Sequence, residues 1–167
     1  MIYFPLRSTI LRSIYYLFLL LPGLSSAAED DKAKNSQISL WTWNVWFDEQ
    51  SAEHRFPEIM SRLHKASPDV VFLQEVTPSF ISSFQTSSLK NEYRLYTTFR
   101  SRISYGLAFL TKSQFSHTKL DSIASQFNRN VFFALIEIDK NKAIVLINVH
   151  LESGQSEKNA RAVQIAQ

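Results

Sequence analysis

Three apolar segments of the sequence end on polar side chains that together suit the chemistry of a phosphate ester. The segment WTWN ends at Asn44, VVFLQE ends at Glu75, and IVLINVH ends at His150. A carboxylate binds a hard cation such as Mg²⁺, and an amide orients a ligating oxygen or a phosphate. An imidazole can donate a hydrogen bond to the negative charge that develops at the phosphorus. The three side chains are therefore candidates for one magnesium-dependent site.

Each of these side chains also has an ordinary structural explanation. A glutamate after a strand is usually a solvated loop residue, and an asparagine there usually belongs to a turn. A histidine is more often a hydrogen-bonded structural residue than a catalyst. The order of the strands decides between the two explanations, and the sequence pattern does not give that order, so both stay open.

Four further residues are weaker candidates for the same site. Arg129 in NRN precedes a predicted strand, where its guanidinium could bind a phosphate through two hydrogen bonds; the alternative is a solvated loop cation. Glu152 and Ser153 in HLES follow His150 closely, and Arg161 on the last predicted helix could orient a carboxylate.

The elements that must position these residues alternate between strands and helices from about Gln37 onward. The segment ISLWTWNVW is rich in β-branched and aromatic residues, as strands are, and DVVFLQE suits a strand that is covered on both faces. Between them, apolar residues at i, i+3, i+4 and i+7 predict a helix over residues 51–66. This strand–helix–strand unit predicts an α/β fold with a right-handed crossover.

The second half of the sequence predicts mostly strands. After a helix from Pro78 to about Leu89, the expected strands lie in YRLYTTF, YGLAFLT, HTKLDSI, VFFALIEID and AIVLINVH, with DKNK as a hairpin turn between the last two. Residues 156–167 predict a final helix whose apolar positions are followed by no further element. Two explanations stay open: this helix docks back on the sheet, or the domain is truncated.

The composition excludes several classes of site. Because the sequence has no cysteine, it has no disulfide, no thiolate metal site and no cysteine nucleophile. It has only three glycines and neither a GxGxxG nor a GxxxxGKS/T segment, which argues against a glycine-rich phosphate loop. The apolar share of 45% and the charged share of 20% are typical of one globular domain.

Residues 1–28 have the pattern of a signal peptide. Arg7 and Arg12 give a basic start, residues 14–24 are apolar, and SSAA supplies small residues for cleavage. An apolar helix of that length spans roughly 17 Å against about 30 Å of hydrocarbon, which favours a secreted or periplasmic protein over a membrane-anchored one. Residues 29–36 are predicted to be a charged linker. Without the two arginines the formal charge falls from +3 to +1, so it gives no evidence of a nucleic-acid-binding surface.

The order of several segments resembles the endonuclease/exonuclease/phosphatase superfamily, and most of all its 5′-tyrosyl-DNA phosphodiesterase branch. These segments are TWNVWFD, SPDVVFLQEVTP, YGLAFLTK, NRNVFFALIEI, NVHLESG and NARAVQ, which extend from about Ser39 to Gln164. The resemblance implies a four-layer α/β sandwich, with two central mixed sheets flanked by helices, of which residues 37–167 form a part. It also implies hydrolysis of phosphodiesters or phosphomonoesters with Mg²⁺ or Mn²⁺.

The resemblance also implies roles for the candidate residues. Glu75 would be the metal ligand, Asn44 would help to position the metal and the phosphate, and His150 would hydrogen-bond the phosphate in the transition state. The substrate stays open between nucleic acid, a phospholipid headgroup and other phosphoesters. The residues expected to line the same site and contact the substrate are Arg129, Glu152 and Ser153.

The sequence departs from the family pattern in its second half. It contains no GDxN segment, whose Asp activates the attacking water in the family, and no late Asp-His pair. The resemblance therefore implies a partial domain, so that these 167 residues are expected to be inactive while a longer form would be a phosphohydrolase. The alternative is a non-catalytic remnant or binding module that keeps the half-sheet.

Overall fold

The computed structural model describes residues 37–98, 104–123, 125, 129–153 and 157–166. The chain divides into the units Met1–Asp30 and Asp31–Gln167, and every described residue belongs to the second unit. The expected signal peptide over residues 1–28 and the expected linker over residues 29–36 lie outside the described residues and stay predictions. None of the helices in the described ranges is long and apolar enough to cross a bilayer.

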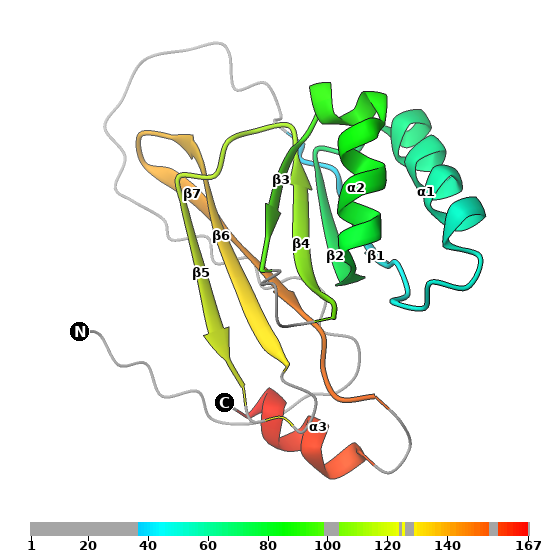
Figure 1. Cartoon of the computed structure of the whole chain (residues 1–167). Helices are drawn as coiled ribbons and strands as arrows, with labels where there is room; N and C mark the ends of the chain where they lie inside the picture. Colours follow the sequence, from blue (N-terminus) through cyan, green and yellow to red (C-terminus); the bar gives the residue numbers. More distant parts are fainter. Residues whose placement is uncertain (1–36, 99–103, 124, 126–128, 154–156, 167) are drawn as a thin grey trace, which may run out of the picture. The chain divides into compact units, whose positions relative to one another are not determined.

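A mixed sheet, here called sheet A, brings the ends of two parallel strands side by side (Figure 1). β1 and β2 pair in parallel, with Asn44 opposite Gln74, and the remaining pairs are antiparallel. The parallel pair confirms the predicted strand–helix–strand unit. The strand order is β1-β2-β4-β3, with β1 at Leu40–Asn44, β2 at Val70–Val76, β3 at Arg94–Thr97 and β4 at Gly106–Thr111.

The first helix covers one face of sheet A, as its spacing predicts. α1 extends over Ala52–Ala66, with Pro57 inside it, and starts one residue after the predicted boundary. Its apolar side chains pack on sheet A because they recur on one face of the helix. The side chains that α1 buries are Ala52, Phe56, Ile59, Met60 and Leu63.

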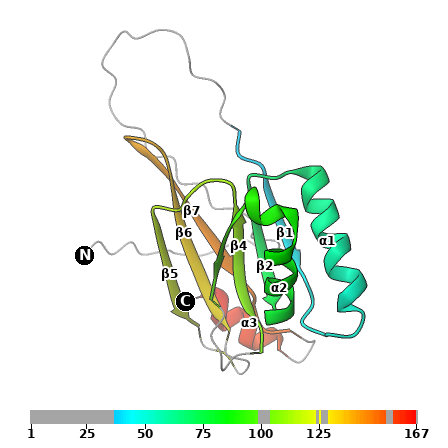
Figure 2. The same ribbon diagram turned by 45° about the horizontal axis from the view of Figure 1, so that its top comes forward.

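The second helix lies beside the first on the same face of sheet A (Figure 2). α2 occupies Pro78–Thr86, where the hydroxyl of Thr77 caps its start by accepting the N–H of Phe80 at 3.2 Å. A short 3-10 helix, η1, follows at Ser88–Asn91 and buries Leu89. The sequence predicted one helix from Pro78 to about Leu89. The structure has two helices there, because Ser87 adopts an extended conformation with ψ at 164°.

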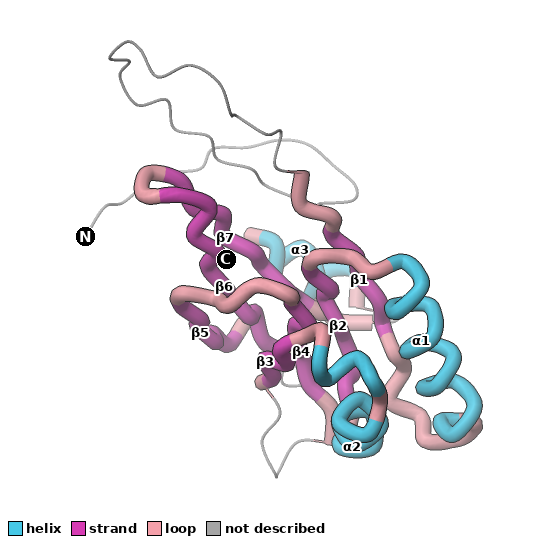
Figure 3. Tube along the Cα trace, turned by 90° about the horizontal axis from the view of Figure 1, so that it is seen from above, coloured by secondary structure: helices cyan, strands magenta, loops and turns pink. Residues whose placement is uncertain are grey.

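A second sheet, here called sheet B, is an antiparallel meander of three strands with the order β5-β6-β7. β6 and β7 form the predicted hairpin, in which Asp139 lies opposite Lys142 across the turn. Sheet B lies against the face of sheet A that the helices leave uncovered (Figure 3). The strands are β5 at His117–Ser122, β6 at Asn130–Asp139 and β7 at Lys142–Val149.

An apolar core fills the space between the two sheets. Phe109 of β4 is its centre, with edge-to-face or tilted contacts to the rings of Phe72, Phe115 and Phe132 at centroid distances of 5.0, 5.3 and 5.1 Å. The described residues thus form helix, sheet and sheet layers, in agreement with the expected α/β sandwich. The outer face of sheet B leaves Val145, Ile147 and Val149 exposed, and in the described part of the chain no helix covers it.

The final helix, α3 at Lys158–Ile165, buries a polar side chain rather than its apolar positions. Gln164 is 5% exposed, and its Oε1 accepts the backbone N–H of Glu152 at 3.0 Å. Val163 and Ile165 are 54% and 59% exposed. The predicted helix is confirmed. Its buried contact is made by the Gln164 amide, which accepts a backbone hydrogen bond from the segment after β7.

Candidate active site

A bulge in β2 changes the direction of the Glu75 side chain. In a regular strand this side chain would point into the core between sheet A and the helices. Side chains alternate between the two faces of a strand, and the odd-numbered Val71 and Leu73 pack against the helices. The register with β4 shifts after Leu73, so Val76 takes the next helix-side position. Glu75 adopts a left-handed φ of 58° at this point. Such a bulge re-aims a side chain, and here it directs the carboxylate towards sheet B.

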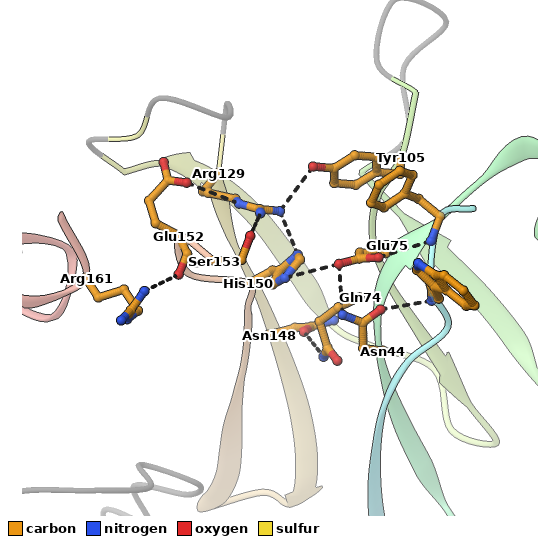
Figure 4. A network of polar contacts seen from close by, with 12 residues as sticks. Asn44, Gln74, Glu75, Tyr105, Arg129, Asn148, His150, Glu152, Ser153 and Arg161 are labelled. Atoms are coloured by element: carbon orange, nitrogen blue, oxygen red, sulfur yellow. Dashed lines mark hydrogen bonds and ion pairs between the residues drawn. The ribbon is translucent and has the colours of Figure 1, made fainter. Parts of the chain in front are cut away.

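The Glu75 carboxylate is held by two donors from the end of β1 (Figure 4). Nδ2 of Asn44 donates to Oε1 at 2.9 Å, and the backbone N–H of Phe47 donates to Oε2 at 3.0 Å. Oδ1 of Asn44 accepts the backbone N–H of Trp46 at 2.9 Å. The Glu75 side chain remains 11% exposed. Its orientation is therefore fixed while an ion from solvent can still reach it.

His150 completes the cluster from the far end of β7. Its Nε2 lies 3.4 Å from Oε1 of Glu75, and its Nδ1 lies 2.7 Å from Nη1 of Arg129. Because a guanidinium can only donate, Nδ1 of His150 must accept this bond and Nε2 must carry the ring proton. The ring therefore presents an N–H to the same space that the Glu75 carboxylate faces.

The surroundings of His150 favour its neutral form. Burial holds the pKa of His150 below its ordinary value, and the charge of Arg129 lowers the pKa further. The carboxylates of Glu75 and Glu152 oppose these effects and are the weaker influence. A second proton would have to occupy Nδ1, where the arginine already donates. Near neutral pH the ring is thus a hydrogen-bond donor rather than a cation.

Arg129 is buried next to His150 and contacts side chains from several separate segments. Beyond its contact with His150, it donates from Nη2 to Oγ of Ser153 at 3.3 Å and from Nη1 to the hydroxyl of Tyr105 at 3.4 Å. Its Nε lies 3.8 Å from Oε2 of Glu152, and the two side chains are only 5% and 0% exposed. The guanidinium and the carboxylate therefore form an ion pair that is shielded from water.

The expected direct contact between Glu152 and a substrate does not fit this geometry. The Glu152 side chain has no exposed surface, and its Oε1 accepts the Ser125 hydroxyl at 2.6 Å. Arg161 donates from Nη1 to the backbone oxygen of Glu152 at 3.2 Å; its expected role in orienting a carboxylate stays a prediction. Glu152 therefore supports Arg129 from behind, whereas Ser153 lies on the more exposed side of that arginine.

Exposed aromatic rings form a rim beside Glu75. The rings of Phe47 and Tyr105 stack with centroids 4.9 Å apart, and Phe47 and Trp46 are 47% and 51% exposed. Arg55 of α1 holds this loop by donating to the backbone oxygens of Val45 and Trp46 at 3.1 Å each and to that of Asp48. Trp46 also has a left-handed φ, at 62°. The loop after β1 is therefore a constrained aromatic surface.

The donor set fits a divalent cation with few protein ligands. No group of three or more His, Asp or Glu side chains able to hold a metal occurs among the residues that the structure describes. Mg²⁺ does not require one, since it usually keeps several waters and binds one or two carboxylates together with substrate phosphates. The Glu75 carboxylate could serve as such a ligand, and the amide oxygen of Asn44, which accepts the Trp46 N–H, has a second lone pair.

Comparison with known proteins shows the family of the chain. The model of the Endonuclease/Exonuclease/phosphatase family matches residues 41–161, most of the described chain. The chain belongs to this family. Its human relative, tyrosyl-DNA phosphodiesterase 2, is 30% identical over 146 residues, which cover 84% of this chain and 39% of that protein. The chain thus spans well under half the length of this curated relative.

Solved structures of family members share the fold. The structure of TDP2 from C. elegans superposes with a TM-score of 0.72 at 23% identity, over 81% of this chain and 42% of that one. The structure of D. rerio TDP2 complexed with single-strand DNA product has a TM-score of 0.67 at 23% identity, over 78% of this chain and 53% of that one. These similarities confirm the predicted sandwich and show that the chain corresponds to a part of it.

The structure brings three of the predicted site residues together, and it adds residues that the sequence patterns did not indicate. Asn44, Glu75 and His150 lie together. Asn44 also makes the turn contact with the Trp46 N–H, and His150 is hydrogen-bonded to Arg129, so the chemical roles of the three residues stay predictions. Sequence patterns did not indicate Tyr105, or the contact between Gln74 and Asn148 at 2.8 Å. Strand alternation did contain a signal for Asn148, since it is a polar residue at an inward position of β7.

Proposed function

We propose that this protein is a divalent-metal-dependent phosphodiester hydrolase in which Glu75, Asn44 and His150 bind the metal and the phosphate. The observation that carries the proposal is the meeting of a carboxylate, an amide and an imidazole from three different strand ends, with Glu75 Oε1 at 2.9 Å from Asn44 and 3.4 Å from His150. Family membership supports phosphoester hydrolysis as the class of reaction.

Each residue has a distinct part in this proposal. Glu75 would hold Mg²⁺ or Mn²⁺ through its carboxylate, in the orientation that Asn44 and the Phe47 N–H impose. The bound ion would polarise the phosphoryl oxygens and neutralise the leaving oxygen. His150 would donate from Nε2 to a phosphoryl oxygen as negative charge develops there, and Arg129 would keep that proton on Nε2.

The proposed substrate is a nucleic-acid phosphodiester. The relatives named tyrosyl-DNA phosphodiesterase 2 support this choice, as does the D. rerio structure that holds a single-strand DNA product. The exposed rings of Trp46 and Phe47 offer surfaces on which a base can stack. If residues 1–28 are a signal peptide, the substrate would be extracellular or periplasmic nucleic acid, with a phospholipid headgroup as the competing substrate.

The residues described here would supply only part of the catalytic machinery. The sequence lacks the GDxN segment that carries the water-activating Asp in the family, and such a general base contributes about 10²- to 10⁴-fold to the rate. We therefore expect these 167 residues to be inactive and a longer form that includes this segment to be a phosphohydrolase.

The test is hydrolysis by a longer form of the protein that includes the GDxN segment, measured with Mg²⁺ and with EDTA. The substrates would be bis-p-nitrophenyl phosphate, a single-stranded oligonucleotide and glycerophosphocholine, with Glu58→Gln on the exposed face of α1 as the matched control for Glu75→Gln. We expect Glu75→Gln to lower the Mg²⁺-dependent rate by about 100-fold or more, while Glu58→Gln keeps it. Equal rates for Glu75→Gln and the wild type would remove Glu75 from the mechanism, and cleavage of glycerophosphocholine alone would replace the proposed substrate.

A further inference from the structure

A buried asparagine joins the two sheets directly beneath the site. Asn148 of β7 is 1% exposed. Its Nδ2 donates to the backbone oxygens of Leu73 at 3.0 Å and Ala108 at 2.8 Å. Its Oδ1 accepts from Nε2 of Gln74 at 2.8 Å (Figure 4). Both amide protons and the amide oxygen are therefore used, and every partner belongs to sheet A.

These contacts lie at the base of the bulge that directs Glu75. Leu73 and Ala108 are opposite one another on β2 and β4, and theirs is the last regular pair before the register shifts. Gln74, the third partner, is the residue immediately before Glu75. A left-handed conformation at a residue other than glycine costs of order 1–3 kcal/mol and persists only where the surroundings fix it. The hydrogen bonds of the Asn148 amide supply such a constraint next to Glu75.

The same residue is also linked to the imidazole of the site. His150 follows Asn148 by two positions, just after the end of β7. Both side chains contact β2, Asn148 at Gln74 and His150 at Glu75. The position of His150 therefore depends on the nearby Asn148, whose side chain is bonded to sheet A next to the bulge. Leu146, two positions before Asn148, fills the inter-sheet core with an apolar side chain, so packing alone does not require an amide at position 148.

We propose that Asn148 is a positioning residue, which holds the β2 bulge and thereby sets the spacing between Glu75 and His150. This inference rests on the proposed function only in its consequence for metal binding; the effect on the bulge is independent of it. A buried side-chain amide is stable in a protein core only when its donors and acceptor are hydrogen-bonded. Here those partners are the two backbone oxygens and the Gln74 side chain that lead into the bulge.

The experiment compares Asn148→Leu with Leu146→Ala, which damages the inter-sheet core without touching the bulge. Two quantities are measured: the backbone scalar couplings of Glu75 by NMR, which report its φ, and the dissociation constant for Mn²⁺ by calorimetry. We expect Asn148→Leu to change the Glu75 couplings from left-handed to extended or averaged values and to weaken Mn²⁺ binding by about 10- to 100-fold. Leu146→Ala should lower the unfolding temperature and leave both quantities unchanged.

The outcomes separate this inference from the proposed function. A folded Asn148→Leu variant with wild-type couplings and wild-type Mn²⁺ affinity would overturn it. If that variant does not fold, Gln74→Leu removes one arm of the contact from a half-buried residue; a smaller change in the same direction supports the inference, and none overturns it. If the wild type itself does not bind Mn²⁺, the metal part of the proposed function fails, and the Glu75 couplings still decide the role of Asn148.

Discussion

The guanidinium of Arg129 lies 2.7 Å from Nδ1 of His150, and this contact fixes which nitrogen of the ring faces the candidate site. Arginine offers only donors, so the proton of the neutral ring is on Nε2, 3.4 Å from Glu75. The orientation and the protonation state of His150 thus depend on a residue that lies 21 positions before it in the chain.

The first prediction concerns the charge of Arg129. Arg129→Gln keeps an N–H donor near His150 and removes the positive charge that, after burial, is the second cause of the lowered pKa of the ring. The pKa of His150 should therefore rise, as measured by NMR titration of its ring protons. Arg94→Gln, a change to an exposed cation on β3, is the control. An unchanged or lower pKa in Arg129→Gln would show that this charge does not act on the ring.

The second prediction concerns the buried ion pair between Arg129 and Glu152. Glu152→Gln leaves the guanidinium buried without its carboxylate, and breaking such a pair typically costs about 3–5 kcal/mol. The free energy of unfolding, measured with urea, should fall by about that amount. Glu58→Gln breaks the exposed pair with Arg62 and should cost less than about 1 kcal/mol. Similar values for the two variants would contradict the importance of the buried pair.

A third prediction links Asp69 to stability at acidic pH. The Ser39 hydroxyl, followed by the Ser39 backbone N–H, lowers the pKa of Asp69, and these bonds join the starts of β1 and β2 at 2.6 and 2.8 Å. A lowered folded-state pKa means that this stabilisation is present above the unfolded pKa and is lost as the pH falls through the folded pKa.

The measurement for Asp69 is a set of urea melts at several pH values. Asp69→Ala should lower the free energy of unfolding by about 1–2 kcal/mol at pH 7, and the difference from the wild type should shrink below about pH 4. Asp121→Ala, on the exposed strand β5, removes a surface pair with Lys119 and should change little at any pH. A difference for Asp69→Ala that stays constant down to low pH would exclude an ionised carboxylate as its cause.

The fourth prediction concerns the aromatic rim. Phe47 is exposed and stacks on Tyr105 beside Glu75, so a nucleic-acid base can extend the stack. Phe47→Ala should weaken binding of a single-stranded oligonucleotide by about 1–3 kcal/mol, measured by fluorescence anisotropy. Ile138→Ala removes an exposed apolar side chain from the β6 hairpin and should not matter. Equal losses in both variants would show that the rim has no specific part in binding.

The sequence predicted the elements well because each carries a local signal. The spacing of Phe56, Ile59 and Leu63 indicated α1, and the apolar run before Glu75 indicated a strand that is covered on both faces; both are confirmed. The hairpin turn before Lys142 is confirmed for the same reason. These features depend on periodicity and turn residues, which short segments contain in full.

The arrangement of the site could be predicted only in part, because it depends on contacts between distant segments. The residue type of Glu75 suggested a metal ligand, but a regular strand would have turned its side chain towards the helices. The bulge that reverses this direction depends on Ala108 and Asn148, which lie far away in the sequence. Likewise, the burial of Glu152 and Gln164 reflects a tertiary contact that the apolar pattern of the last helix did not indicate.

The most direct test of the account is the affinity of the protein for Mn²⁺, measured by calorimetry for the wild type, Glu75→Gln and Glu58→Gln. The account predicts that the wild type and Glu58→Gln bind equally, and that Glu75→Gln binds at least about 10-fold more weakly because a hard cation loses its carboxylate ligand. Binding of Mn²⁺ by Glu75→Gln with the affinity of the wild type would contradict it.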